Sequence, residues 1–248
     1  MSQVPAATRA LRVLRFLSSQ ADPVPLEAIM RACELPRSTT YHLVNTMIDE
    51  GFVVHLADER RYGLGVGAFE VGSGYARQAP LQRIARRPLA QLVDRIGQSA
   101  HLAVLHGRDV LYVVEERAPG RPPLVTDVGV RLPAHLTASG RAILAGLSAS
   151  QVRALYPDKD AFVDRNGSGP QSPTALRAVL ADTRRRGYAV EDGEVTSGLR
   201  SIAVPVLDHN EHPVAGIAVT YPSDVADPPA AMIAQVARQL SQRLGARV

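Results

Sequence analysis

Three stretches near the start of the chain carry apolar residues at helical spacing. In each, apolar or small side chains recur at i, i+3, i+4 and i+7, which gathers them on one face of a helix. The spacing predicts helices over residues 8–19, 26–33 and 36–50, with a turn at 21–25 and a tight turn between the second and third. The inward-facing residues are expected to be Ala10, Val13, Leu14, Leu17, Leu26, Ile29, Met30, Cys33, Thr40, Leu43, Val44 and Met47.

A β-hairpin is predicted to follow these helices. Two segments, 52–54 and 61–64, flank the polar run 57–60, a pattern typical of two strands joined by a turn. The glycine-rich residues 65–78 are ambiguous between helix and loop. Pro80 opens a helical pattern that ends near Ile96, and Pro88 within it is expected to kink or restart the helix.

From His101 onward the pattern changes to strands. Two antiparallel hairpins are predicted, one over 101–106 and 110–115, the other over 201–207 and 214–221. A further strand is expected over 123–130. Helices are expected over 137–147, 150–156 and 174–186 and at the end of the chain, where Met232, Val236, Leu240 and Leu244 share one side. Hairpins mixed with a few helices indicate an α+β second domain, with a domain boundary near residue 80.

Composition narrows the class of protein. The chain has 248 residues, enough for two domains, and is 46% hydrophobic and 21% charged, which argues against a disordered or membrane protein. Cys33 is the single cysteine, so no intrachain disulfide can form, and a reducing compartment is expected. With no secretory signal at the N-terminus, we expect a cytoplasmic protein.

The net charge of +4 does not by itself indicate DNA binding, because the first 79 residues hold eight Arg and eight acidic residues. A local feature does: no acidic residue occurs between Leu35 and Ile48. Two helices joined by a tight turn, the second with an apolar inner face and a hydrogen-bonding outer face, indicate a helix-turn-helix, which the hairpin makes winged. An α-helix fits the DNA major groove. Candidate DNA contacts are Arg37, Ser38, Thr39, Tyr41, His42 and Asn45 in the helix and Arg60 and Arg61 in the hairpin.

No signature of an enzyme is found in the sequence. It contains no Gly-x-Ser-x-Gly elbow, no dinucleotide fingerprint and no phosphate-binding loop. His101, His106 and His135 are separated along the chain, and a metal site made from them is the less favoured interpretation. We therefore expect no catalysis, no cofactor and no metal. The alternative to a DNA-binding regulator is a stand-alone small-molecule-binding or protein-interaction module that does not contact DNA.

Several segments resemble the IclR family of bacterial transcriptional regulators, over almost the whole chain and in the family's order. In the first half they are Thr8-Arg9-Ala10-Leu11-Arg12-Val13-Leu14, Leu35-Pro36-Arg37-Ser38-Thr39 and Tyr62-Gly63-Leu64-Gly65. In the second half they are His135-Leu136-Thr137-Ala138-Ser139-Gly140-Arg141-Ala142, Gly187-Tyr188-Ala189, Glu191 to Glu194, and Ser197-Gly198-Leu199-Arg200-Ser201-Ile202-Ala203-Val204-Pro205-Val206. One departure is His42, where family members usually carry Arg.

The resemblance implies an α+β fold in which an N-terminal winged helix-turn-helix is joined by a connector helix to a GAF-like α/β effector-binding domain. It implies a DNA-binding domain over 5–67, connector helices over 68–97 and the effector domain over 98–248. The implied partners are double-stranded operator DNA, a small carboxylic acid, and a second copy of the chain in a homodimer or a dimer of dimers, with no membrane. The resemblance leaves activation versus repression open.

The effector-binding residues that the resemblance implies are Leu124, Leu132, Ala138, Ser139, Gly140, Glu191, Leu199, Ser201, Ala218 and Thr220. Physical reasoning supports part of this set, because backbone N–H groups at a helix start, here 138–140, suit a carboxylate. Ala218 stands where acid-binding members carry Ser, and Glu191 replaces a shorter carboxylate. The lost hydroxyl at 218 favours an aromatic or larger carboxylic acid over a two- or three-carbon keto acid.

Overall fold

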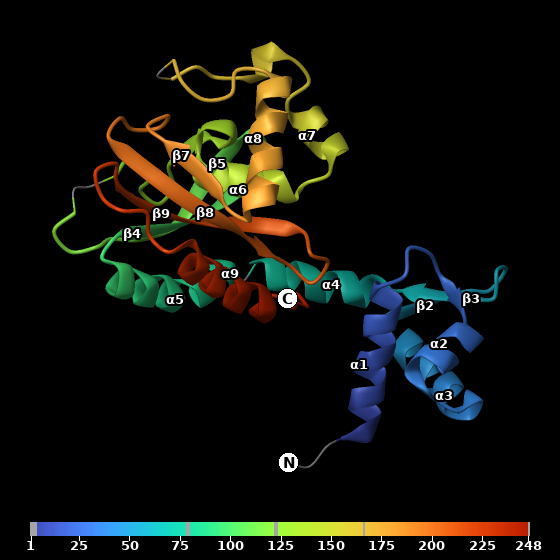
Figure 1. Cartoon of the computed structure of the whole chain (residues 1–248). Coiled ribbons are helices and arrows are strands. Elements are labelled where there is room, and N and C mark those ends of the chain that lie inside the picture. The colour runs from blue at the N-terminus through green and yellow to red at the C-terminus, as the bar shows by residue number, and fades with distance from the viewer. Residues whose placement is uncertain (1–3, 78–79, 122–123, 166, 248) are drawn as a thin grey trace. The chain divides into compact units, whose positions relative to one another are not determined.

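The computed structural model describes residues 4–77, 80–121, 124–165 and 167–247, and the chain forms two compact units, 1–80 and 81–248 (Figure 1). The division falls inside the segment 68–97 that the sequence assigned to the connector. Its first helix, α4 (Val66–Arg77), belongs to the first unit, and its second, α5 (Pro80–Ile96), lies almost wholly in the second.

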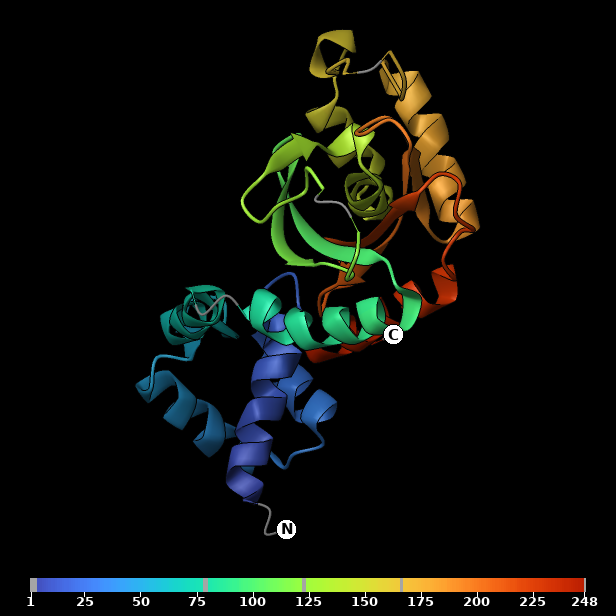
Figure 2. The same ribbon diagram turned by 90° about the vertical axis from the view of Figure 1, so that its left-hand side faces the viewer.

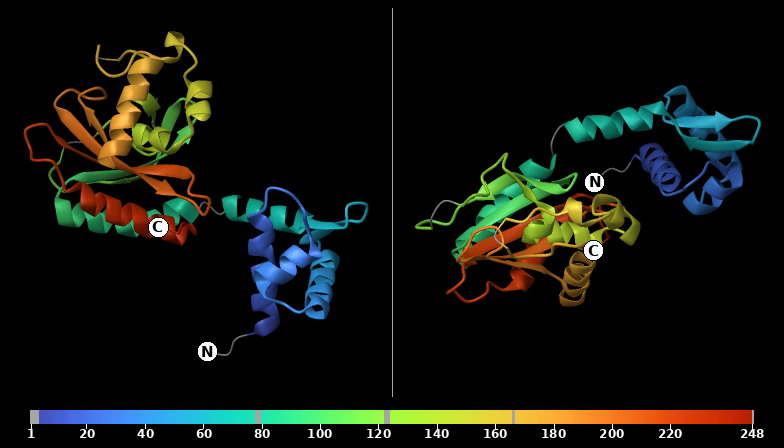
Figure 3. Two further views of the ribbon diagram at one scale, coloured as in Figure 1. Left: turned by 45° about the vertical axis from the view of Figure 1, so that its right-hand side comes forward. Right: turned by 90° about the horizontal axis from the view of Figure 1, so that it is seen from above.

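Three further helices and a small sheet, together with α4, build the first unit. The helices are α1 (Pro5–Ser18), α2 (Leu26–Cys33) and α3 (Arg37–Asp49), and Val13, Ile29 and Val44 lie fully buried between them. The predicted hairpin is present as β2 (Val53–Leu56) and β3 (Arg61–Leu64), and it projects from the unit (Figure 3). The helix and hairpin predictions for this half of the chain are thus confirmed.

One expectation for this unit needs correction, and one open point is resolved. The stretch expected to be a plain turn contains a two-residue strand, β1 (Val24–Pro25), which pairs with β3 and extends the hairpin to a three-stranded sheet of order β1-β3-β2. The ambiguous glycine-rich segment is helical as α4. Just before α4 the backbone passes close to that of Gly51, and a glycine at position 65 permits this. A Cβ at Gly65 would lie 2.3 Å from the carbonyl oxygen of Gly51.

The second unit is organised around one six-stranded sheet of order β6-β5-β4-β9-β8-β7, antiparallel throughout and strongly curled (Figure 2). The strands are β4 (Ser99–His106), β5 (Asp109–Glu116), β6 (Arg131–Pro133), β7 (Ala189–Asp192), β8 (Leu199–Leu207) and β9 (Pro213–Pro222). Both predicted hairpins are present as β4–β5 and β8–β9. The expected strand over 123–130 is wrong, because residues 124–130 form an irregular loop before the short β6. The strand β7 was not predicted.

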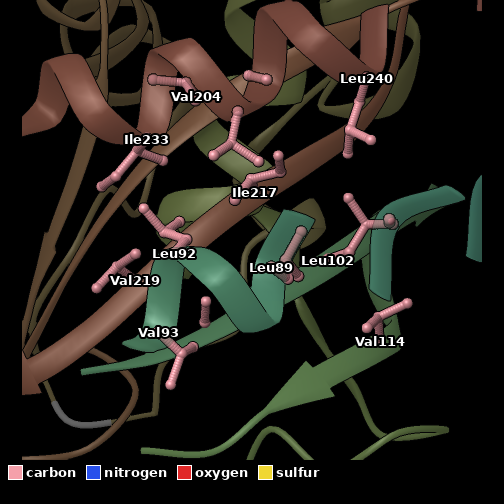
Figure 4. Packing of buried hydrophobic residues seen from close by; sticks show 14 of the residues in the cluster. Leu89, Leu92, Val93, Leu102, Val114, Val204, Ile217, Val219, Ile233 and Leu240 are labelled. Carbon is pink, nitrogen blue, oxygen red and sulfur yellow. The ribbon is translucent and has the colours of Figure 1, made fainter. Parts of the chain in front are cut away.

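Helices cover both faces of this sheet. On one face lie α5 and α9 (Ala230–Arg243), which bury Leu89, Leu92, Ile233 and Leu240 against strand residues such as Ile217 (Figure 4). On the other face lie α6 (Ala138–Gly146), α7 (Ala149–Leu155) and α8 (Pro173–Arg186), with short 3-10 turns at Ala134–Leu136 and Lys159–Ala161 (Figure 1). The resulting fold is α+β, as the sequence predicted. No helix among the described residues is long and apolar enough to cross a membrane.

Small side chains allow α6 to lie very close to the sheet. Ala138 and Ala142 of the helix pack on Ala189, Ala203 and Ala218 of β7, β8 and β9. Beside them, a Cβ at Gly216 would lie 2.6 Å from the carbonyl oxygen of Ser139. This close contact fixes the start of α6 against the middle of the sheet.

The packing of Gly140 predicts a strong effect of a single added methyl group. A Cβ at Gly140 would lie 2.2 Å from the carbonyl oxygen of Ala134, so Gly140→Ala forces the backbone apart and should lower the free energy of unfolding by about 2 kcal/mol or more. The matched control is Gly72→Ala in α4, where nothing lies within 4 Å and the higher helix propensity of Ala should stabilise by up to about 1 kcal/mol. Urea unfolding of both variants checks this, and equal stability of the two would contradict it.

Candidate functional site

A wide groove lies between α3 and the β2–β3 hairpin in the first unit, with a volume of about 1450 Å³. Six of the eight predicted DNA contacts line it: Arg37, Ser38, Tyr41 and His42 from α3, and Arg60 and Arg61 from the hairpin. The other two, Thr39 and Asn45, are half-buried and do not line the groove. Residues that sequence reasoning did not include are Pro25, Leu26, Glu27, His55, Ala57, Glu59 and Tyr62.

The arginines of the groove are not equivalent. Arg37 Nη1 lies 3.3 Å from Glu27 Oε1 of α2, so part of its charge is already paired. Arg61 Nη1 donates a hydrogen bond of 2.9 Å to the carbonyl oxygen of Pro23, which ties the hairpin to the chain before β1. Arg60 sits at the tip of the hairpin, exposed and with φ at 54°, and its side chain forms no ion pair within the described part of the chain. Of these three cations, Arg60 is therefore the one most available to an external anion.

The inner and outer faces of α3 differ as predicted. Thr40, Val44 and Met47 are buried in the core, and Thr40 Oγ1 donates back to the carbonyl oxygen of Pro36. The Tyr41 side chain, by contrast, is 51% exposed and its ring lies edge-on to that of His42. The outer face thus presents hydroxyl, imidazole and guanidinium groups that can hydrogen-bond phosphates and base edges.

A second candidate site is a small cavity in the second unit, at the start of α6. Eight of the ten predicted effector-binding residues line it: Leu124, Ala138, Ser139, Glu191, Leu199, Ser201, Ala218 and Thr220. The other two lie elsewhere. Leu132 is buried in the neighbouring apolar cluster with Val110 and Ile143, and Gly140 packs on the backbone of Ala134. The cavity volume of about 20 Å³ is room for roughly one water molecule, so a ligand must move some of the lining groups.

The start of α6 offers backbone donors to this cavity. The Thr137 side chain caps the helix by accepting a hydrogen bond from the Gly140 amide at 3.0 Å. The amides of Ala138 and Ser139 belong to the first helical turn, whose N–H groups have no partner within the helix. A helix N-terminus of this kind stabilises a nearby negative charge.

A row of polar side chains crosses three neighbouring strands on the cavity side. Glu191 of β7 pairs in register with Ser201 of β8, which pairs with Thr220 of β9, and the two hydroxyl oxygens lie 3.0 Å apart. Glu191 is only 3% exposed. This burial raises the pKa of the Glu191 carboxyl to about 7, and the charge of Glu194 adds to the rise, although the Val195 amide donates to Glu191 at 3.0 Å. Glu191 can therefore act near neutral pH either as an acceptor or, when protonated, as a donor.

Seven lining residues were missed by sequence reasoning: His101, Tyr112, Val125, Thr126, Thr137, Val195 and Thr196. His101 is 1% exposed, and its Nε2 lies 2.7 Å from Thr126 Oγ1 and 3.7 Å from Glu115 Oε1. The imidazole of His101, together with the Arg117 guanidinium, holds the pKa of Glu115 at about 2 against the opposing effect of burial. Burial raises the pKa of Tyr112 to about 12, which keeps its hydroxyl protonated. The sequence signal for His101 was its position at the start of a mostly apolar strand pattern.

No group of three or more His, Cys, Asp or Glu side chains in the described part of the chain is arranged to hold a metal ion. His106 is exposed and its Nδ1 contacts Arg131, while His135 packs edge-on against Tyr156 and Phe162. The three histidines considered from the sequence therefore lie in three separate environments.

Comparison with known proteins gives matches over both units. Residues 6–57 match the model of the IclR helix-turn-helix domain, and residues 73–244 match that of the bacterial transcriptional regulator IclR C-terminal domain. The transcriptional repressor IclR of Escherichia coli is 31% identical over 222 residues, which cover 89% of this chain and 81% of that protein. The probable transcriptional regulator SauR of Cupriavidus necator is 34% identical over 219 residues, covering 88% and 86%.

A solved structure shows the same fold with a ligand. It is an IclR homologue from Microbacterium hydrocarbonoxydans complexed with 4-hydroxybenzoate, with a TM-score of 0.61 and 24% identity, covering 96% of this chain and 98% of that one.

The raised pKa of Glu191 predicts a pH-dependent stability. A carboxyl with a pKa of about 7 when folded, against 4.5 when unfolded, costs nothing below pH 4.5, and its penalty grows until the pH passes 7. Glu191→Gln should therefore gain stability relative to the natural chain between pH 5 and pH 8, by up to about 3 kcal/mol. Urea unfolding at both pH values measures this, with the partly exposed Glu116→Gln as the control. A Glu191→Gln difference that does not change with pH would contradict it.

Proposed function

The chain belongs to the IclR family of bacterial transcriptional regulators, and we propose that it is a ligand-responsive regulator whose affinity for operator DNA is set by a small carboxylic acid. The observation that carries the ligand-sensing part is the cavity at the start of α6, which the first two residues of the helix line together with the buried polar residues Glu191, Ser201 and Thr220. A regulator of this kind works on the chromosome, so we expect it in the cytoplasm.

The DNA-binding surface proposed here is the groove between α3 and the hairpin. Helix α3 enters the major groove, where Ser38, Tyr41 and His42 reach base edges or phosphates. Thr39 and Asn45 lie at the margins of this face of α3. They contact DNA only where the walls of the DNA major groove come close to the sides of the helix. Arg60 and Arg61 at the hairpin contact the phosphate backbone, with Arg60 free to move toward it.

We expect the chain to act as a homodimer or a dimer of dimers. Helix α4 exposes Val66, Phe69 and Val71, with Phe69 75% exposed, and α1 exposes Leu11. Large apolar side chains gathered on a helix surface are typical of protein interfaces. A symmetric dimer presents two recognition helices to DNA, so the operator should be nearly palindromic.

The ligand we propose carries a carboxylate at the start of α6. Ala218 lies beneath the start of α6, and Thr220 lies two residues further along β9. The polar row of Glu191, Ser201 and Thr220 is therefore about 7 Å from Ala218 along the strand direction. A carboxylic acid with a second polar group at that distance spans both ends, and a para-substituted benzene ring has this length. The 4-hydroxybenzoate bound to the homologue from Microbacterium is such a molecule, which supports an aromatic acid here.

The effector can change DNA affinity only through a difference in its own affinity for two states of the protein. A complete switch needs a difference of about 5.5 kcal/mol. The small volume of the cavity supports such a difference in affinity between two states. A ligand larger than one water fits only when the lining residues rearrange, so it stabilises the rearranged state.

DNA binding is tested by gel-shift titration against the DNA upstream of the protein's own gene. Ser38→Ala combined with His42→Ala should cost about 1–3 kcal/mol on the preferred sequence and much less on random DNA. Arg60→Ala should weaken both equally and lower the salt slope by about one. Arg177→Ala, an exposed arginine of α8, is the control. Binding without sequence preference, unaffected by the α3 substitutions, would contradict the proposal.

Ligand binding is tested by melting the protein with a panel of acids: 4-hydroxybenzoate, benzoate, pyruvate and glyoxylate. A ligand present at a hundredfold its Kd stabilises by about 2.7 kcal/mol and should raise Tm by several degrees. Ser201→Leu fills the polar row with an apolar side chain and should abolish the shift, whereas Ser150→Leu, on exposed α7, should keep it. A shift that survives Ser201→Leu would place the ligand elsewhere.

A further inference from the structure

The effector cavity contains a buried polar atom that the protein itself does not satisfy. His101 lines the cavity and is 1% exposed, and its Nδ1 completes no hydrogen bond within the described chain. Ser139, equally buried in the same cavity, has the Tyr112 hydroxyl as a neighbour. Buried donors and acceptors in folded proteins are almost always paired. The unpaired ring nitrogen of His101 therefore indicates that a bound molecule pairs with it.

The His101 ring is held from its other side. Nε2 faces Thr126 Oγ1 at 2.7 Å and Glu115 Oε1 at 3.7 Å, and Arg117 Nε lies 3.0 Å from Glu115 Oε1. The Thr126 hydroxyl and the Glu115 carboxylate therefore both lie on the Nε2 side of the ring. These contacts fix the ring and leave Nδ1 as the atom available to a ligand.

The sheet register brings this atom to the start of α6. His101 of β4 pairs with Ala218 of β9, and Ala218 belongs to the same buried alanine cluster as Ala138, the first residue of α6. Ser139, which also lines the cavity, is the next residue of the helix. A carboxylate bound by the first amides of α6 therefore lies above Ala218, between the helix and His101.

We propose that His101 is a ligand-contacting, specificity-determining residue that binds the effector carboxylate through Nδ1, opposite the amides of α6. This inference rests on the proposed function of the cavity and adds a residue to it. An N–H at Nδ1 donates to the ligand carboxylate, while Nε2 keeps its hydrogen bond with the Thr126 hydroxyl. Arg117, Glu115, His101 and the ligand then form a continuous chain of polar contacts.

The same contact links the ligand to one wall of the cavity. Thr126 and Asp127 belong to the irregular loop 124–130, and they are bonded to His101 and to Arg117 respectively. Leu124 and Val125 of this loop line the cavity. Among the described residues, the other ionisable groups that line the cavity are Glu191 and Tyr112, and Glu191 belongs to the far end of the ligand. His101 thus favours a ligand with a charged carboxylate over one with a neutral group at the same place. Through Thr126 it also holds the loop 124–130 against the cavity.

Matched ligands and variants test this by isothermal titration calorimetry of the full-length protein. The probes are 4-hydroxybenzoate and 4-hydroxybenzamide, which share their shape while only the first carries a charge; if another acid of the panel binds better, that acid and its amide replace them. His101→Leu should weaken acid binding by about tenfold or more, as expected for losing a hydrogen bond to a charged group, and amide binding by much less. His101→Asn, which keeps a donor, should retain part of the preference for the acid.

Two further variants separate recognition from folding. His106→Leu changes the same residue type at the exposed end of the same strand and should leave both affinities unchanged. Thr126→Val removes the loop contact while keeping Nδ1 and should lower acid affinity by a smaller factor, so it carries the test if His101→Leu does not fold.

The outcomes separate this inference from the proposed function. If the natural chain binds no acid of the panel, the acid-binding function and the role of His101 both fall. If it binds an acid but the His101 variants lose acid and amide equally, or lose neither, the function stands and the role of His101 is overturned.

Discussion

The close packing of α6 on the sheet is the constraint on which the candidate effector site depends. Ala138 and Ala142 meet Ala203 and Ala218, and Gly216 lies under the backbone of Ser139. Because no larger side chain stands between them, the first turn of the helix ends directly above the strands. The first residues of that turn, the polar row of β7 to β9 and the His101 ring are thereby brought around one small volume. A bulkier residue at any of these positions would separate the helix from the sheet and open the site.

Burial and neighbouring charges shift the pKa values of two glutamates near this cavity in opposite directions. Burial raises the pKa of Glu191 more than its hydrogen bonds and the charge of Arg141 lower it, whereas Glu115 faces His101 and Arg117 and its pKa falls. Two glutamates on the same sheet therefore differ in charge near neutral pH. The end of the cavity near β4 favours an anionic group, and the end near β7 favours a group that exchanges hydrogen bonds with a neutral or ionised carboxyl. This asymmetry orients a ligand that has two different polar ends.

The DNA-binding unit achieves its function without net positive charge. Its acidic residues balance its arginines in number, but α3 keeps its outer face free of carboxylates until Asp49. Internal contacts decide which cations remain available. Arg37 is paired with Glu27 and Arg61 holds the carbonyl of Pro23, so both have a structural task as well. The surface offered to DNA therefore consists mainly of the hydrogen-bonding side chains of α3, with few unpaired positive charges. Such a surface favours sequence-specific binding over purely electrostatic binding.

Periodicity alone was sufficient for the amphipathic helices and the two long hairpins, because the positions that face the core follow from local geometry. It also placed the hydrogen-bonding face of α3 opposite Thr40, Val44 and Met47. Local pattern failed where pairing partners are distant: β7 and β1 are too short to show alternation, and loop 124–130 has strand-like composition but no partner strand. The same reason explains the cavity. Glu191, Ser201 and Thr220 were suggested by family resemblance, but His101 and Thr126 become neighbours only through strand register and the path of a loop, and Leu132 and Gly140 are turned away by packing. The sequence by itself determined the elements and their buried faces; the tertiary structure decided which polar atoms meet, because such contacts join residues far apart in the chain.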